Sequence, residues 1–140
     1  MSIRMSITPL LLFMLAIPAF ASEPNIEPGL WEYNNVMRAE GIPMPEQRTS
    51  NQECVTREDV ERGAAFVEDA EDCEVSDLNL TRDRGSYTMV CVQEGVQVNM
   101  DVDMRFGGNT MEGTIRMDLE SPMGPMRMNM EISGRRTGDC

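Results

Sequence analysis

The chain has 140 residues and a formal net charge of −12, from 24 acidic and 12 basic residues. Every basic residue is arginine, and the sequence contains neither lysine nor histidine. Binding to nucleic acid or to an anionic membrane surface needs clustered positive charge, so this composition argues against both kinds of partner. The length allows one domain with a modest core.

The first 21 residues have the pattern of a secretory signal peptide. Arg4 provides a short positive segment, residues 7–20 form an apolar stretch, and Ala19-Phe20-Ala21 fits an A-x-A cleavage site. The apolar stretch contains two prolines and is short for a transmembrane helix, which needs about 20 residues. We therefore expect cleavage before Ser22 and a periplasmic or secreted product without an integral membrane segment.

Removing 21 of the 140 residues leaves 119, which we assign to a single domain over residues 22–140. Of the 12 arginines, 11 remain against 24 acidic residues, so the mature net charge is −13. The densest acidic stretch, residues 67–77, offers the oxygen ligands that calcium prefers. It lacks the spacing and the glycine of an EF-hand loop, so we interpret it as a solvated loop.

Two strands are predicted at the start of this domain. Residues 29–37 place three large side chains at alternate positions, as a strand does, namely Trp31, Tyr33 and Met37. Residues 38–46 contain one glycine and two prolines and indicate a turn. Residues 47–54 are extended in character but polar, which favours an edge strand.

Residues 56–63 carry the one clear helix signal. Thr56 is suited to cap the N-terminus, Asp59 follows three residues later, and Gly63 ends the helix. A helix this short needs tertiary contacts to persist.

From Cys73 onward, apolar and polar residues alternate with the period of β-strands. This alternation predicts five strands, over about residues 74–81, 86–92, 96–106, 109–119 and 126–136. In the first hairpin we expect Leu80 opposite Tyr87 and Leu78 opposite Met89.

The next two turns predict a register. A two-residue loop at Gly107-Gly108 would set Met104 opposite Met111, Met100 opposite Ile115 and Val98 opposite Met117. A turn at residues 121–124 would set Met117 opposite Met128, Ile115 opposite Met130 and Asp118 opposite Arg127. Both hairpins gather apolar residues on one face, and a slip by one residue would invert that face.

Together these elements predict a mostly β fold. We expect an antiparallel up-and-down meander of about seven strands, in a curved sheet or half-barrel, with one short α-helix.

An even number of cysteines in a small exported domain predicts two disulfides among Cys54, Cys73, Cys91 and Cys140. In a meander, Cys73 and Cys91 lie at the same sheet end, whereas Cys140 follows an odd number of strands and lies at the other. This count favours Cys73–Cys91 and Cys54–Cys140, because a disulfide needs Cα atoms within about 4.4–6.8 Å. Strict alternation points Cys73 and Cys91 to opposite faces, so Cys73 must precede its strand or lie at a bulge.

Four of the eight residues 123–130 are methionine, and thioethers are soft ligands suited to Cu(I) or Ag(I). The candidate metal ligands near one sheet end are Met117, Met123, Met126 and Met128. Alternate methionines on a strand are core by default, because methionine fills gaps in a curved sheet. We therefore prefer a structural role and keep soft-metal binding as the alternative. The strand pattern does not explain Met123, which falls in the turn.

A methionine-rich sheet face has a second use, because barrels and half-barrels hold apolar ligands. For a mature chain of 119 residues, we favour a core filled beneath the helix over an open ligand site.

No catalytic constellation is evident. Without histidine and lysine, the commonest general base and Schiff-base chemistry are excluded. The carboxylates of Asp101 and Asp103 alternate outward on a strand, where solvated charge is expected. We expect a non-enzymatic binding or envelope-associated module without a cofactor, whose partner is a small apolar ligand or an envelope protein.

The segments PGLWEY, QECVTREDV, GSYTMVC, MEGTIRM and MNMEISGRRTGDC together resemble the secreted proteobacterial family known as domain of unknown function 3617. The resemblance extends from Pro28 to Cys140, and its most specific parts are the ending SGRRTGDC and the four cysteine positions. It implies export in a Gram-negative bacterium and a structural role for the methionine-rich strands. It implies no active site.

Overall fold

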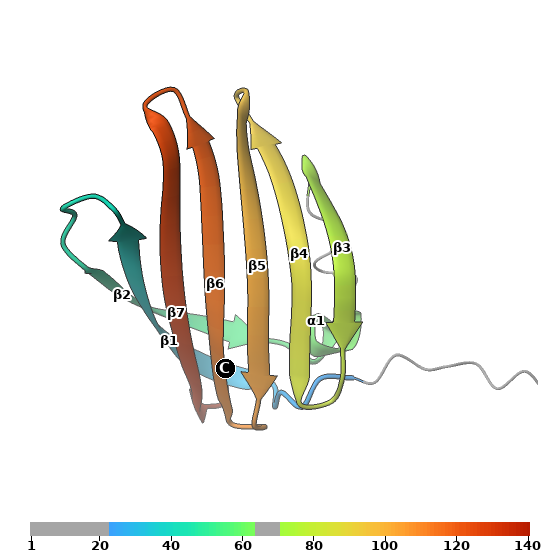
Figure 1. Ribbon diagram of the computed structural model, residues 1–140. Helices are drawn as coiled ribbons and strands as arrows, with labels where there is room; N and C mark the ends of the chain where they lie inside the picture. Colours follow the sequence, from blue (N-terminus) through green and yellow to red (C-terminus); the bar gives the residue numbers. More distant parts are fainter. Residues whose placement is uncertain (1–22, 64–70) are drawn as a thin grey trace, which may run out of the picture.

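The computed structural model describes residues 23–63 and 71–140 (Figure 1). These residues form seven strands and one helix. In chain order the elements are β1 (Gly29–Glu40), β2 (Gln47–Val55), α1 (Arg57–Arg62), β3 (Cys73–Leu80), β4 (Arg84–Gln93), β5 (Val96–Phe106), β6 (Thr110–Ser121) and β7 (Gly124–Gly138). The predicted signal peptide and residues 64–70, which include the first four residues of the acidic stretch, lie outside the described residues.

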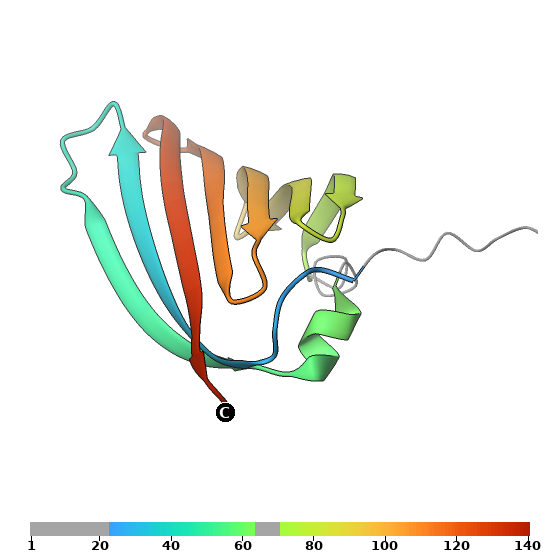
Figure 2. The ribbon, with the colours of Figure 1, turned by 90° about the horizontal axis from the view of Figure 1, so that it is seen from below.

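All seven strands belong to one antiparallel sheet in the order β2-β1-β7-β6-β5-β4-β3. Strands β3 to β7 form a meander, and the β1–β2 hairpin extends it by pairing β1 with β7. The chain then crosses from edge strand β2 to edge strand β3 through the segment that contains α1. The sheet curves without closing (Figure 2), which confirms the predicted mostly β fold and the edge position of residues 47–54.

The predicted β6–β7 register is confirmed. Met117 pairs with Met128 and Ile115 with Met130, while Asp118 pairs with Arg127 on the opposite face.

The predicted β5–β6 register is wrong by two residues. Met104 pairs with Gly113 instead of Met111, Met100 pairs with Met117, and Ile115 pairs with Val102. Four residues separate the last pair of the hairpin, Phe106 and Met111, and the N-terminal lead-in binds this loop: Gly108 N–H donates to Asn25 O at 2.8 Å, and Glu27 N–H donates to Gly108 O at 2.9 Å. A shift by two residues keeps the same side chains on the same face.

The β3–β4 hairpin also differs from its predicted register. Leu80 pairs with Gly85 instead of Tyr87, and Val75 takes the place opposite Met89 that was expected for Leu78. The register shifts between Ser76 and Asn79, where Asp77 has a φ of 53°. This irregularity restores Cys73 to the face of Cys91, its partner in the ladder.

Helix α1 begins and ends as the sequence predicts. The Thr56 hydroxyl accepts a hydrogen bond from Asp59 N–H, while the Asp59 carboxylate accepts from Thr56 N–H, which forms a capping box. Gly63 follows the last turn with a φ of 42°. Val60 is buried and anchors this short helix to the sheet.

Strand pleating gives the sheet two different faces. We call the face that carries Trp31, and on which α1 packs, the inner face; the opposite face is the outer face. Only four hydrophobic residues of the described chain are buried, namely Trp31, Val60, Cys91 and Val102. The core expected beneath the helix is therefore small, and most of the inner face is only partly buried. No helix in residues 23–63 and 71–140 is long and apolar enough to cross a membrane.

Candidate ligand-binding face

Methionine side chains form a continuous row across four neighbouring strands of the inner face. Met89 pairs with Met100, Met100 with Met117, and Met117 with Met128. Because adjacent strands lie about 4.8 Å apart, these residues form a ladder that runs perpendicular to the strands. We call these four residues the methionine ladder.

Apolar side chains continue the inner face on both sides of the ladder. Toward one end, Val98, Leu119 and Met126 form the next row, and toward the other end the row is Val102, Ile115, Met130 and Met37. Each described methionine outside the β1–β2 and β6–β7 turns lies on this face and is partly exposed. The result is a broad apolar surface that is partly exposed to solvent.

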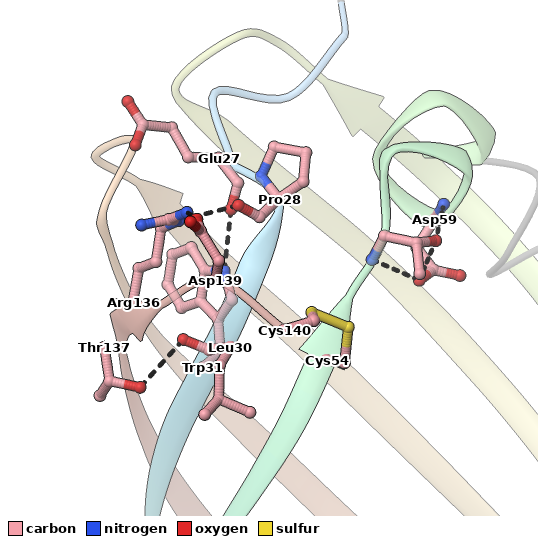
Figure 3. Close-up of a disulfide and its surroundings, with 11 residues drawn as sticks. Glu27, Pro28, Leu30, Trp31, Cys54, Asp59, Arg136, Thr137, Asp139 and Cys140 are labelled. Carbon is pink, nitrogen blue, oxygen red and sulfur yellow. Dashed lines mark hydrogen bonds and ion pairs between the residues drawn. A yellow bond between two sulfur atoms is a disulfide. The ribbon is translucent and has the colours of Figure 1, made fainter.

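The two ends of the inner face are built differently. At the α1 end lie Trp31, α1 and the Cys54–Cys140 disulfide (Figure 3). At the far end lie the connections β1–β2, β4–β5 and β6–β7 (Figure 1). All four exposed large hydrophobic residues of the described chain lie in or next to these far-end connections: Ile42, Met44, Val92 and Met123.

Trp31 organises the α1 end. Its side chain is 0% exposed, and its indole N–H donates to Glu27 O at 2.9 Å. Its ring stacks on Tyr33 with centroids 6.1 Å apart. Gly134 lies under both rings, where a Cβ atom would stand 2.8 Å from a Tyr33 ring carbon. Burial and, secondarily, the charge of Glu53 raise the pKa of Tyr33.

The C-terminal segment is bound to the same end (Figure 3). Arg136 donates through Nε to Pro28 O at 2.8 Å, and the Thr137 hydroxyl donates to Leu30 O at 3.1 Å. Cys140 then joins Cys54 on β2, with Cα atoms 5.6 Å apart. Three consecutive elements of the sheet edge, β2, β1 and β7, are thereby tied together.

One hollow lies on the inner face at the α1 end, and another lies at the far end of the sheet, mainly on the outer face. At the α1 end, a hollow of about 260 Å³ separates α1 from the sheet, and its lining includes Tyr33, Val55 and Gly63. At the far end, a hollow of about 580 Å³ is lined mainly by outer-face residues, namely Glu40, Asp118, Glu120 and Arg127, and only partly by Leu119 and Met126.

The outer face is polar and carries several ion pairs. Arg127 Nε lies 2.7 Å from Asp118, and Arg38 contacts both Glu46 and Glu131 at 2.7 and 2.9 Å. Two open hollows of about 420 and 450 Å³ on this face are lined mainly by such charged side chains and by serine, threonine and asparagine. Exposed ion pairs of this kind contribute little to affinity or stability.

The carboxylates considered as candidate catalysts lie on the outer face. Asp101 accepts a hydrogen bond from the Thr88 hydroxyl at 3.1 Å, and Asp103 forms an ion pair with Arg84. Within residues 23–63 and 71–140, no three histidine, cysteine, aspartate or glutamate side chains gather as a metal site.

The fold brings three of the four candidate thioether ligands together and leaves the fourth, Met123, apart. Met117 and Met128 face each other in the ladder, and Met126 lies one inner-face position before Met128 on β7, toward the far end. Met123 lies in the β6–β7 turn and is 93% exposed. Sequence reasoning missed Met89 and Met100 as neighbours of this group, because the predicted β5–β6 register paired Met100 with Ile115.

The cysteines form the pairs Cys54–Cys140 and Cys73–Cys91, which are the pairs that the strand count favours. Two disulfides are typical of a domain that folds outside the reducing cytoplasm.

Comparison with curated proteins and with solved structures finds no match for this chain. A family model covers residues 26–140, which include all described strands and the helix. The family is described as "Protein of unknown function (DUF3617)", and the chain belongs to it.

Proposed function

We propose that this protein is an exported, non-enzymatic binding module that holds an apolar ligand on its inner face. The observation that carries the proposal is the partial exposure of the methionine ladder and its apolar neighbours, while Trp31 is the one large side chain that is fully buried among the residues the structure describes. Covering apolar surface gains about 25 cal/mol per Å², so a ligand that occupies this face is bound by the hydrophobic effect. Large exposed apolar surfaces mark such sites.

Methionine suits this role because its side chain is flexible and polarizable. Surfaces built from methionine adapt to ligands of different shape. Trp31 and α1 occupy the α1 end of the inner face, whereas the ladder and the row of Val98, Leu119 and Met126 toward the far end are partly exposed and open to a ligand.

A fluorescence titration tests this proposal. The probe is N-phenyl-1-naphthylamine, an uncharged apolar dye whose emission rises in apolar surroundings. Replacing the facing pair Met117 and Met128 with glutamine places two amides on the inner face, and we expect the dye affinity to fall about tenfold, given the cost of burying unpaired polar groups.

The matched control changes the next facing pair of the same two strands, on the outer face. Arg116→Gln with Asn129→Gln should leave dye affinity unchanged. Equal losses in the two double variants, or no dye binding by the unaltered protein, would refute the apolar face as a ligand site. Native mass spectrometry of protein purified from the periplasm would identify a retained ligand.

Export is proposed from the signal-peptide pattern and is supported by the two disulfides. N-terminal sequencing of the mature protein should begin at Ser22, in a periplasmic or secreted fraction. Retention of Met1 in the membrane fraction would contradict this assignment.

Soft-metal binding is the second candidate, and the methionine ladder is the observation that favours it. A ladder on a sheet presents thioethers side by side at strand spacing rather than around one point. We therefore expect only weak Cu(I) binding in competition with a chelator. Sub-micromolar affinity that Met126→Leu with Met128→Leu abolishes would favour the metal over the apolar ligand.

A further inference from the structure

We propose that the methionine ladder is an oxidant-sensitive modification site, at which sulfoxide formation lowers the affinity of the inner face for its apolar ligand. The inference rests on the proposed function and adds a chemical means of regulating it. The oxidant class is electrophilic chlorine, represented by hypochlorous acid.

The distribution of sulfur in the chain supports this inference. All four cysteines are bound in disulfides, so the thioethers are the sulfur atoms left to react with an electrophile. Trp31, another oxidisable side chain, is 0% exposed. The ladder methionines are partly exposed, and they lie on the proposed ligand face rather than scattered over the surface.

The four ladder side chains are partly exposed to solvent. Helix α1, with its buried residue Val60, packs at the α1 end of the inner face. Two rows from the ladder, Gly113 stands opposite Met104, whose sulfur occupies the space that a Cβ atom would fill. The inner face therefore exposes thioethers from several strands at once.

The reaction is balanced with hypochlorous acid alone. A sulfur lone pair attacks chlorine and hydroxide leaves; water then adds to sulfur as chloride and protons leave. The net change joins one oxygen atom to sulfur, which loses two electrons, and converts hypochlorous acid into chloride and a proton. The product, methionine sulfoxide, is polar and is reduced back to methionine by dedicated reductases.

The consequence for binding follows from the polarity of the product. A sulfoxide oxygen accepts hydrogen bonds from water, and an apolar ligand that covers it removes those bonds without replacement. Oxidation of two or more neighbouring ladder residues should lower the affinity for an apolar molecule about tenfold.

The test compares N-phenyl-1-naphthylamine affinity before and after treatment with a few equivalents of hypochlorous acid, and peptide mapping locates each added oxygen atom. We expect sulfoxide at the ladder and about a tenfold loss of affinity. In a variant with leucine at all four ladder positions, the side chains stay apolar and similar in size but do not react with the oxidant, and its affinity after treatment is compared with its own affinity before treatment. This variant should lose less than about threefold on treatment.

A second variant, Met44→Leu with Met123→Leu, removes the exposed turn methionines and should respond to the oxidant like the unaltered protein. Full dye affinity in protein that carries ladder sulfoxides, or an equal loss in the ladder variant, would overturn the inference while the proposed function stands. Failure of the untreated protein to bind dye would remove the proposed function, and this inference with it. If the fourfold variant does not fold, Met100→Leu with Met117→Leu supplies the same comparison.

Discussion

The α1 end and the far end of the sheet share the same strands but differ in what holds them. At the α1 end, Trp31, Val60, a capped helix and the Cys54–Cys140 disulfide hold β2, β1 and β7 together. At the far end, turns carry exposed apolar residues, and the inner-face side chains between them are partly exposed. The α1 end holds Trp31, Val60 and the attached C-terminus, whereas the far end is held by the Cys73–Cys91 disulfide, and its other inner-face side chains remain partly exposed.

Among the changes considered, substitution of Trp31 should lower the free energy of unfolding the most. Trp31→Ala empties the centre of the α1 end and should lower the free energy of unfolding by an amount near the top of the range of about 3–5 kcal/mol. Met117→Ala, on the partly exposed ladder, should cost about 1 kcal/mol. Urea denaturation of both variants measures the difference, and equal costs would show that the ladder is as much a core as the α1 end.

Removing each disulfide in turn should show how much each end of the sheet contributes to the free energy of unfolding. Cys54 and Cys140 are 86 residues apart, so their disulfide should contribute about 4 kcal/mol on the chain-entropy model. Cys73 and Cys91 are 18 residues apart and should contribute about 3 kcal/mol. Denaturation of the two paired serine variants tests the order, and peptide mapping without reduction tests the pairing. A peptide that links Cys54 to Cys73 would contradict the topology.

A single glycine probes the packing at the α1 end. Gly134→Ala places a methyl group 2.8 Å from the Tyr33 ring and should cost about 1–3 kcal/mol through overpacking. Gly138→Ala in the same strand meets no atom within 4 Å and should be close to neutral. Similar free energies of unfolding for the two variants would mean that the Tyr33 ring moves away from residue 134 without a loss of stability.

Elements with a local cause were predictable from the sequence. Thr56, Asp59 and Gly63 define α1 through hydrogen bonds between near neighbours, and the turn at residues 121–124 sets the Met117–Met128 pair directly. The two-residue period of the strands is enough to assign side chains to the inner face, because a register shift of two residues leaves each side chain on the same face. These features depend on few residues that are close in sequence.

Features that depend on distant segments were not predictable in this way. In the β5–β6 loop, Gly108 donates a hydrogen bond to Asn25 O and accepts one from Glu27 N–H, and these two residues lie about eighty residues earlier in the chain. The register shift between Ser76 and Asn79 was missed for another reason: it lies at Asp77, whose left-handed backbone conformation is not visible in the alternation of apolar and polar residues. The partial exposure of the methionine ladder also depends on what packs over it, and the sequence pattern of a strand is the same for a covered and an uncovered face.

The smallest expected effect concerns the pH dependence of the α1 end. Hydrogen bonds from the Thr56 hydroxyl and backbone N–H lower the pKa of Asp59. Because the folded-state pKa is below the unfolded value, the stabilisation is complete above the ordinary aspartate pKa of about 4 and is lost as the pH falls through the folded-state pKa. Denaturation midpoints measured from neutral pH downward should therefore fall less steeply in Asp59→Asn than in the unaltered protein. The neighbouring Glu58→Gln, which lacks this capping contact, should keep the original slope. An unchanged acid slope in Asp59→Asn would mean that the cap does not couple α1 to the stability of the sheet.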